Sequence, residues 1–195
     1  MHPTELKVLD GQITYQPKYF ESSKADILFQ LLIHSIKWSQ EEMKMYGKLV
    51  KFPRLTAWYG DAGMTYRYSG KTYNPLAWTD DLLEIKKSIE TSTQQEFNSV
   101  LLNYYRNGQD SMGWHADDEK ELGPNPFIAS INFGATRPFQ IRHNHTKEKY
   151  EILLEHGSLL TMGGTFQHHW KHQIPKRLGI QDPRINLTFR KIKRD

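Results

Sequence analysis

The sequence contains no cysteine among its 195 residues. This absence excludes disulfide bonds, thiol nucleophiles and every zinc site that depends on cysteine ligands. A metal site formed by side chains would therefore use His, Asp and Glu. The sequence also lacks the run of roughly 18 apolar residues that a membrane-spanning helix needs, so we expect no membrane association.

Targeting and repeat signals are missing as well. Residues 1–5 do not form a basic stretch followed by an apolar one, so no secretory signal is predicted. We expect a protein that is cytoplasmic, or nuclear in a eukaryote, and not secreted. Without repeats, low-complexity tracts or linkers, residues 1–195 are expected to form a single domain that acts as a monomer.

The residues that are present predict ordinary folding, because 37% are hydrophobic and 25% are charged. Aromatic residues reach 12%, which suits either strands or surfaces that stack on bases. The formal net charge of +4 permits a polyanionic partner without requiring one.

Two helices are predicted in the first half of the chain. The first spans about residues 23–38, with Ser22 or Ser23 as its cap, and the second spans about residues 79–90, with Thr79 as its cap. The apolar residues at helical spacing are Ile27, Leu28, Leu31, Leu32 and Ile36 in the first helix, and Leu82, Leu83, Ile85 and Ile89 in the second.

Short strands dominate after Gln95, separated by turn signals such as Asn107-Gly108 and Gly163-Gly164. The fold class is therefore α+β, a double-sheet barrel or sandwich buttressed by N-terminal helices. The predicted strands are Phe97–Arg106, Phe127–Phe133, Pro138–Arg142, Tyr150–Glu155, Ser158–Met162, His168–Ile174 and Arg184–Arg190.

A candidate metal site begins at His115-Ala116-Asp117. In an extended segment alternate side chains point the same way, so His115 and Asp117 can hold one ion. A distant histidine would complete the two-His, one-carboxylate set of non-haem iron(II) oxygenases. A surface loop that carries the pair by chance is the alternative, because short motifs match often.

The segment Arg184–Arg190 alternates strictly between apolar and polar residues, which predicts a strand. Arg184 and Arg190 share its polar face, and guanidinium groups bind carboxylates well, so this face can hold a small dicarboxylate. An ordinary strand with a wet polar face is the alternative.

Three histidines fall within the segment Gln167–His172. On a strand, His168 and His172 would share a face and His169 would take the other. A structural role for this histidine-rich strand end, with His169 satisfied by hydrogen bonds, is the alternative, and the local pattern does not choose between the candidate ligands.

Taken in order, these motifs resemble the AlkB family of iron(II)- and 2-oxoglutarate-dependent dioxygenases, especially its animal-type DNA-repair branch. The resemblance covers about residues 25–192 and implies a double-stranded β-helix, or jelly-roll, core. The segments that carry it are Tyr59–Tyr66, His115–Glu119, His156–Leu160 and Pro183–Arg190.

The resemblance also implies roles for individual residues. The Fe(II) ligands would be His115, Asp117 and His172. The residues that bind 2-oxoglutarate would be Asn103, Tyr105, Arg184, Asn186 and Arg190. Arg184 would take the distal carboxylate of the keto acid, and Arg190 with Asn103 the carboxylate near the metal.

The implied reaction consumes 2-oxoglutarate and O₂ and produces succinate and CO₂. An N-alkyl carbon on a nucleobase is hydroxylated, and the hemiaminal collapses to an aldehyde (formaldehyde from a methyl group) and the restored base. The implied partner is alkylated DNA with lesions of the 1-methyladenine and 3-methylcytosine type.

The resemblance places the flipped base against Tyr66 and Tyr68, with His115 as the opposite wall. Tyr68 stands where Phe is expected. Asp118 and Glu119 match positions that read an exocyclic amino group. The alternative makes the two tyrosines core aromatics and the acidic pair a solvated run.

Met45-Tyr46-Gly47 aligns with a hairpin that wedges into duplex DNA, and a buried hairpin contact is its alternative. We expect substrate recognition in about residues 40–75 and a catalytic core in about residues 95–192. Other functions that stay open are an RNA demethylase, a protein or small-molecule hydroxylase, and a non-catalytic jelly-roll binding module. Basic residues that can contact phosphates are Lys44, Lys48, Lys51, Arg142, His143, His145, Lys147 and Lys149.

Overall fold

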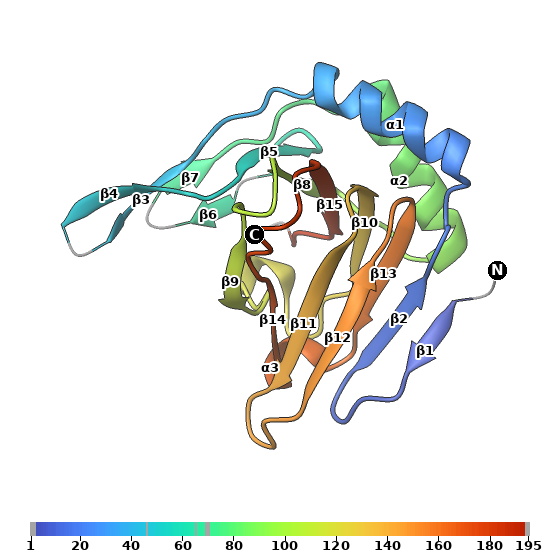
Figure 1. Ribbon diagram of the computed structural model, residues 1–195, viewed down its shortest axis with the longest axis vertical. Coiled ribbons are helices and arrows are strands. Elements are labelled where there is room, and N and C mark those ends of the chain that lie inside the picture. Colours follow the sequence, from blue (N-terminus) through green and yellow to red (C-terminus); the bar gives the residue numbers. More distant parts are fainter. Residues whose placement is uncertain (1–2, 46, 65, 69–70, 194–195) are drawn as a thin grey trace.

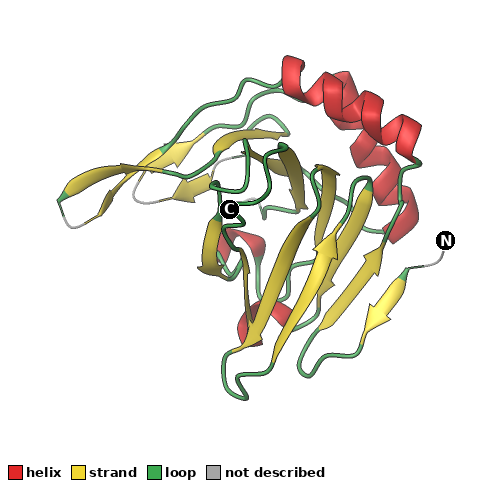
Figure 2. Ribbon diagram, viewed as in Figure 1, coloured by secondary structure: helices red, strands yellow, loops and turns green. Residues whose placement is uncertain are grey.

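The protein folds into two antiparallel sheets that face each other, with two long helices on one side (Figures 1 and 2). The computed structural model describes residues 3–45, 47–64, 66–68 and 71–193. Within them, no helix is long and apolar enough to cross a membrane. This arrangement is the expected jelly roll.

The larger sheet has the strand order β1-β2-β13-β10-β15-β8-β5. Its two outermost strands on one side come from the N-terminus, where we had not predicted strands, because they are short and only Ile13 is fully buried. The strands are β1 (Thr4–Leu6), β2 (Gln12–Gln16), β5 (Leu55–Gly60), β8 (Ser99–Tyr105), β10 (Ile128–Gly134), β13 (Ser158–Gly163) and β15 (Arg184–Arg190).

The smaller sheet has the order β12-β11-β14-β9 and packs against the larger one. Apolar side chains of both sheets meet between them, among them Ile128 and Met162 from one and Phe139 and Trp170 from the other. The strands are β9 (Met112–His115), β11 (Arg137–His143), β12 (Lys149–Leu154) and β14 (Trp170–Ile174).

Strand β15 confirms the predicted alternation, and its two faces meet different layers. Ile185, Leu187 and Phe189 belong to the core under the helices, whereas Arg184 and Arg190 point between the sheets. All seven residues are buried. The alternative of a wet polar face is therefore wrong, because the smaller sheet covers that face.

Helix α1 (Ser22–Ser35) is shorter than predicted, and Glu21 occupies its N-cap position without a side-chain cap. Neither Ser22 nor Ser23 caps it. Leu28 and Leu32 face the sheet, but Ile27 and Leu31 are exposed because the helix forms an outer layer and buries one narrow stripe.

Helix α2 (Asp80–Thr93) confirms Thr79 as its cap, since the Thr79 hydroxyl accepts a hydrogen bond from the Leu82 N–H at 3.3 Å. It extends one turn beyond the predicted end. Leu82, Ile85 and Ile89 are buried, whereas Leu83 is exposed.

The expected strand from His168 starts later. Residues 166–169 form a single helical turn, α3 (Phe166–His169), and β14 begins at Trp170. The expectation that His168 shares a strand face with His172 is therefore wrong. A 3-10 turn, η1 (Lys120–Leu122), follows the segment His115–Asp117, here called the His-x-Asp segment.

Two small hairpins extend from the body on the side away from the N-terminus (Figure 1). One pairs β3 (Glu42–Met45) with β4 (Lys48–Lys51), and the other pairs β6 (Tyr66–Tyr68) with β7 (Lys71–Tyr73). Lys48, Leu49 and Lys51 are exposed.

The loop between β8 and β9 sets the position of the His-x-Asp segment. Arg106 Nε and Nη2 donate to both carboxylate oxygens of Asp110 at 2.8 Å. Arg137 Nη2 donates to the carbonyl oxygens of Asp110 (2.8 Å) and Pro175 (2.7 Å). A Cβ on Gly108 would lie 1.7 Å from the Arg177 carbonyl oxygen, so only glycine fits there.

Because the Asp110 carboxylate is held by this loop, the free energy of unfolding should fall as the pH is lowered and Asp110 takes up a proton. Burial by itself raises its pKa, but the hydrogen bonds and charge of Arg106 lower it overall. A lowered folded-state pKa means that the contribution is present above the unfolded pKa and lost as pH falls through the folded one. At pH 7, Asp110→Asn is expected to lower the free energy of unfolding by roughly 2 kcal/mol.

Urea denaturation at pH 7, with thermal unfolding from pH 7 down to the acid limit, measures this effect. The difference between wild type and Asp110→Asn should shrink at low pH, whereas the exposed control Asp182→Asn should differ little at any pH. A difference that stays constant down to the acid limit would contradict the assignment.

Candidate active site

The three predicted metal ligands meet between the sheets. His115 ends β9, His172 lies on β14, and the two are direct cross-strand partners. Asp117 follows two residues after His115. The candidate ligand atoms of all three lie within 4.8 Å of one another, and His172 Nε2 is 3.7 Å from Asp117 Oδ2. The chance-loop alternative does not account for this convergence.

Two of the three predicted ligands, Asp117 and His172, are in the protonation state that metal binding requires. Burial alone raises the pKa of Asp117, but the charges of Arg190, His172 and His115 lower it below its ordinary value. Arg190 Nη2 donates to Asp117 Oδ1 at 2.5 Å. Burial lowers the pKa of His172 to about 3, so its imidazole is neutral. Metal ligation requires an ionised carboxylate and a neutral imidazole.

The hydrogen bonds of His115 fix its tautomer. His115 Nδ1 lies 2.9 Å from the Gly113 carbonyl oxygen, which only accepts, so Nδ1 carries the proton and Nε2 keeps its lone pair. Metal-binding histidines commonly donate their second N–H in this way. His172 Nδ1 is buried and has no hydrogen-bond partner in the described part of the chain. Two imidazoles and one carboxylate fit Fe(II) and leave positions open.

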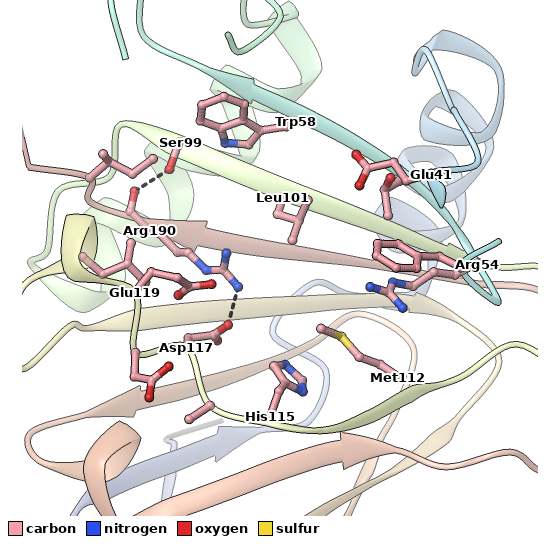
Figure 3. Close-up of a pocket in the computed structure, with 16 residues that line it drawn as sticks. Glu41, Arg54, Trp58, Ser99, Leu101, Met112, His115, Asp117, Glu119 and Arg190 are labelled. Carbon is pink, nitrogen blue, oxygen red and sulfur yellow. Dashed lines mark hydrogen bonds and ion pairs between the residues drawn. The ribbon is translucent and has the colours of Figure 1, made fainter. Parts of the chain in front are cut away.

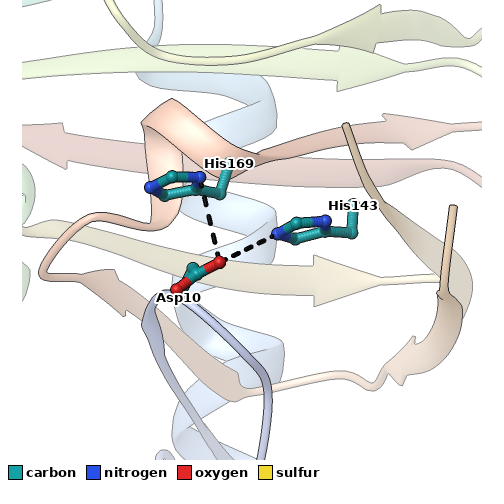
Figure 4. Close-up of side chains that lie close together, drawn as sticks. All are labelled: Asp10, His143 and His169. Carbon is teal, nitrogen blue, oxygen red and sulfur yellow. Dashed lines mark ion pairs between the residues drawn. The ribbon is translucent and has the colours of Figure 1, made fainter. Parts of the chain in front are cut away.

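In a second cluster, Asp10, His143 and His169, the candidate ligand atoms also lie within 4.8 Å of one another (Figure 4). The hydrogen bonds of His143 differ from those of His115, because the Nδ1 atom of His143 accepts where that of His115 donates. His143 Nδ1 accepts from the backbone N–H groups of His145 (3.3 Å) and Thr146 (3.0 Å). The proton of neutral His143 therefore lies on Nε2, which faces Asp10 Oδ2 at 3.4 Å. That tautomer offers an N–H to the carboxylate and no lone pair to a metal.

The five residues predicted to bind 2-oxoglutarate line one cavity beside the three predicted metal ligands. Antiparallel pairing explains their convergence, because Arg184 stands opposite Tyr105 and Asn186 opposite Asn103 on the neighbouring strand. Arg190 lies at the end of the cavity nearest Asp117. The cavity also contains His115 and His172.

Arg184 is the strongest feature of this cavity. It is 1% exposed, and its Nη2 donates to Asn132 Oδ1 at 2.5 Å. Its Nε and Nη1 have no hydrogen-bond partner among the described residues. Burial lowers its pKa to about 10, which leaves it charged at neutral pH. A buried cation with free donors is costly, so the site fits a carboxylate ligand.

Sequence analysis did not predict several residues that support this cavity. Asn186 Nδ2 donates to Ser130 Oγ (2.7 Å) and Asn132 Oδ1 (3.1 Å) on β10. The available signal was the placement of these two polar residues at alternate positions in an otherwise apolar strand. Arg54 was also missed; its Nε donates to Asn103 Oδ1 at 2.8 Å.

A second cavity of about 350 Å³ is lined by two of the three predicted metal ligands, His115 and Asp117. Figure 3 shows Trp58 and Leu101 on one side of it, with His115 and Asp117 opposite. His115 therefore forms one wall of this cavity. Asp118 and Glu119 also line the cavity, and their part in reading a base stays a prediction. Trp58 had no predicted role.

Four of the predicted substrate contacts cannot be placed. Tyr46 lies outside the described residues. Met45, Tyr66 and Tyr68 lie on described strands, but their side chains lie outside the description. Gly47 has φ +82°, which suits the turn of the β3–β4 hairpin.

Comparisons with known proteins agree with this geometry. The family model of the 2OG-Fe(II) oxygenase superfamily matches residues 12–190. The chain is 41% identical to alpha-ketoglutarate-dependent dioxygenase alkB homolog 3 of Bos taurus, over 98% of this chain and 68% of that protein. It is 41% identical to DNA oxidative demethylase ALKBH2 of Homo sapiens, over 89% of this chain and 70% of that protein.

The chain is also similar to more distant proteins. DNA oxidative demethylase ALKBH2 of Arabidopsis thaliana is 31% identical over 92% of this chain and 66% of that protein, so the chain spans about two thirds of these relatives. The solved structure of OsALKBH1 aligns with a TM-score of 0.65 at 17% identity, over 96% of this chain and 100% of that one, which shows the fold. The chain therefore belongs to the AlkB family within the iron(II)- and 2-oxoglutarate-dependent oxygenase superfamily.

Proposed function

We propose that this chain removes N-alkyl groups from DNA bases by oxidation. The observation that carries the proposal is that the two cavities adjoin and share His115, Asp117 and Arg190. The smaller cavity contains the partly unpaired guanidinium of Arg184. The larger cavity, of about 350 Å³, is also lined by Glu41 and Phe52, which flank the β3–β4 hairpin in the chain. A dicarboxylate and a base can therefore reach one centre from two directions.

In this proposal His115, Asp117 and His172 bind Fe(II), which when bound activates O₂. Arg184 binds the distal carboxylate of 2-oxoglutarate, and Arg190 with Asn103 binds the carboxylate near the metal. Tyr105 and Asn186 complete that pocket. One N-methyl group, 2-oxoglutarate and O₂ give one N–H, formaldehyde, succinate and CO₂.

The base would enter the cavity between Trp58 and His115, flipped out of its strand. Asp118 and Glu119 can accept hydrogen bonds from an exocyclic amino group, which favours 1-methyladenine and 3-methylcytosine lesions. Tyr66 and Tyr68 are proposed to stack on the base.

The hairpin with Met45, Tyr46 and Gly47 is proposed to wedge into the duplex. Recognition would then belong to about residues 40–75 and catalysis to about residues 95–192 of a single domain. Two of the relatives are named DNA oxidative demethylases, which supports DNA as the partner. We propose that the chain acts as a monomer in a compartment that holds DNA.

Release of formaldehyde and succinate from methylated oligonucleotides tests the function. Single- and double-stranded DNA and RNA would be compared, with Fe(II), ascorbate and 2-oxoglutarate present and Asp117→Ala as the control. Turnover of methylated DNA that disappears in Asp117→Ala is the expected result. Succinate formation with demethylation of RNA alone, or of no nucleic acid, would contradict the DNA assignment.

The tautomers of the two histidine clusters predict one metal site. Titration with Co²⁺, followed by its visible absorbance, should show tight binding of about one equivalent. His172→Ala should abolish that binding. His143→Asn retains an acceptor for the Thr146 turn and should leave the affinity unchanged. Loss of the signal in His143→Asn alone would contradict the assignment.

Arg184 predicts how 2-oxoglutarate affinity responds to mutation. Arg184→Lys keeps the charge but loses the forked geometry. Because hydrogen bonds to charged groups contribute roughly 1.5–3 kcal/mol, the KM for 2-oxoglutarate should rise about 10- to 100-fold. Steady-state kinetics with the exposed control Arg177→Lys measures this effect. An unchanged KM would remove Arg184 from the pocket.

A further inference from the structure

We propose that Gln167 is a positioning residue that holds the segment bearing Asp117, so that one carboxylate oxygen faces the metal site. The inference rests on the proposed role of Asp117 as a ligand. Gln167 lies on α3, far from Asp117 in the sequence, and had no predicted role. Its side-chain Oε1 accepts the backbone N–H of Asp117 at 2.9 Å.

The Asp117 segment needs such support because it lies beyond regular structure. Strand β9 ends at His115, and the backbone of residues 116–119 belongs to no strand. The Asp117 N–H is therefore bonded to a side chain in place of a neighbouring strand. Gln167 is 3% exposed, and its Nε2 lies 3.7 Å from Met162 Sδ on β13. The amide thus connects the larger sheet to this loop.

Gln167 can position another residue because α3 itself is held firmly. The neighbouring Phe166 is fully buried and stacks on Trp170, with ring centroids 5.9 Å apart. Trp170 Nε1 donates to the Leu9 carbonyl oxygen at 2.7 Å. A Cβ on Gly11 would lie 2.9 Å from Phe166 Cα, so the turn between β1 and β2 packs directly on α3.

The charge around Asp117 explains why its backbone must be fixed. Arg190 donates to Oδ1, whereas Oδ2 faces His172 Nε2 at 3.7 Å. A carboxylate on a mobile segment could turn both oxygens toward the guanidinium, since paired N–H···O bonds are the preferred geometry. With the backbone N–H bonded to Gln167, Oδ1 can pair with Arg190 while Oδ2 stays available to a metal.

The test compares the Co²⁺ affinity of Gln167→Met, which removes the acceptor at similar length, with that of Gln167→Glu, which retains it. Residues that orient metal ligands typically contribute 10- to 100-fold in affinity. Gln167→Met should therefore raise the Co²⁺ dissociation constant at least tenfold. Gln167→Glu should bind at least as tightly as wild type, because the acceptor remains and its charge attracts the cation.

Gln140→Met is the matched control. Gln140 is half-buried on β11, where its amide bonds to Glu151 and Gln173, and its replacement should leave the dissociation constant within about twofold. The apo proteins are compared by thermal unfolding, so that a loss of stability is separated from a loss of affinity. If Gln167→Met does not fold, Gln167→Asn, whose shorter amide cannot reach Asp117, takes its place.

The outcomes separate this inference from the proposed metal site. Unchanged Co²⁺ affinity in folded Gln167→Met or Gln167→Asn would overturn the positioning role, as would an equal loss in Gln167→Met and Gln167→Glu. Unchanged affinity in Asp117→Ala would overturn the ligand assignment itself, and the role of Gln167 with it.

Discussion

Burial of the polar face of β15 is the constraint on which the site depends. Every residue from Arg184 to Arg190 is buried, because helices cover one face of the larger sheet and the smaller sheet covers the other. Two arginines inside a protein must be satisfied by hydrogen bonds or charge. Arg190 has the carboxylate of Asp117. Arg184 has Asn132 and two donors left for a ligand.

The same constraint orders the neighbouring strands. β8 and β10 flank β15, and their inward polar residues, Asn103 and Asn132, stand opposite Asn186 in register. Buried polar groups of this kind form a connected network, in which each position depends on the others. The pocket is therefore a property of three paired strands and not of one motif.

Hydrogen-bond direction distinguishes the two histidine clusters better than distance does. Both clusters bring three candidate ligand atoms within 4.8 Å of one another. At His115 a carbonyl oxygen fixes the proton on Nδ1 and frees Nε2. At His143 two backbone N–H groups occupy Nδ1 and leave the proton on Nε2. The first arrangement suits metal binding, whereas the second joins Asp10, in the turn between β1 and β2, to β11 and α3.

The sequence by itself determined what depends on local spacing. The alternation in Arg184–Arg190 predicted β15 and its two faces, Thr79 predicted the start of α2, and the spacing of His115 and Asp117 predicted that their side chains lie close together. These inferences succeeded because backbone geometry alone sets which neighbouring side chains point together.

Only the tertiary structure decided what depends on distant segments. His172 is set apart from His168 because α3 interrupts the strand, and Ile27 is exposed because no layer covers α1. The contacts of Ser130 and Gln167 arise across 56 and 50 residues of chain. Periodicity shows which residues share a face, but packing of remote elements decides whether that face is covered and which atoms meet there.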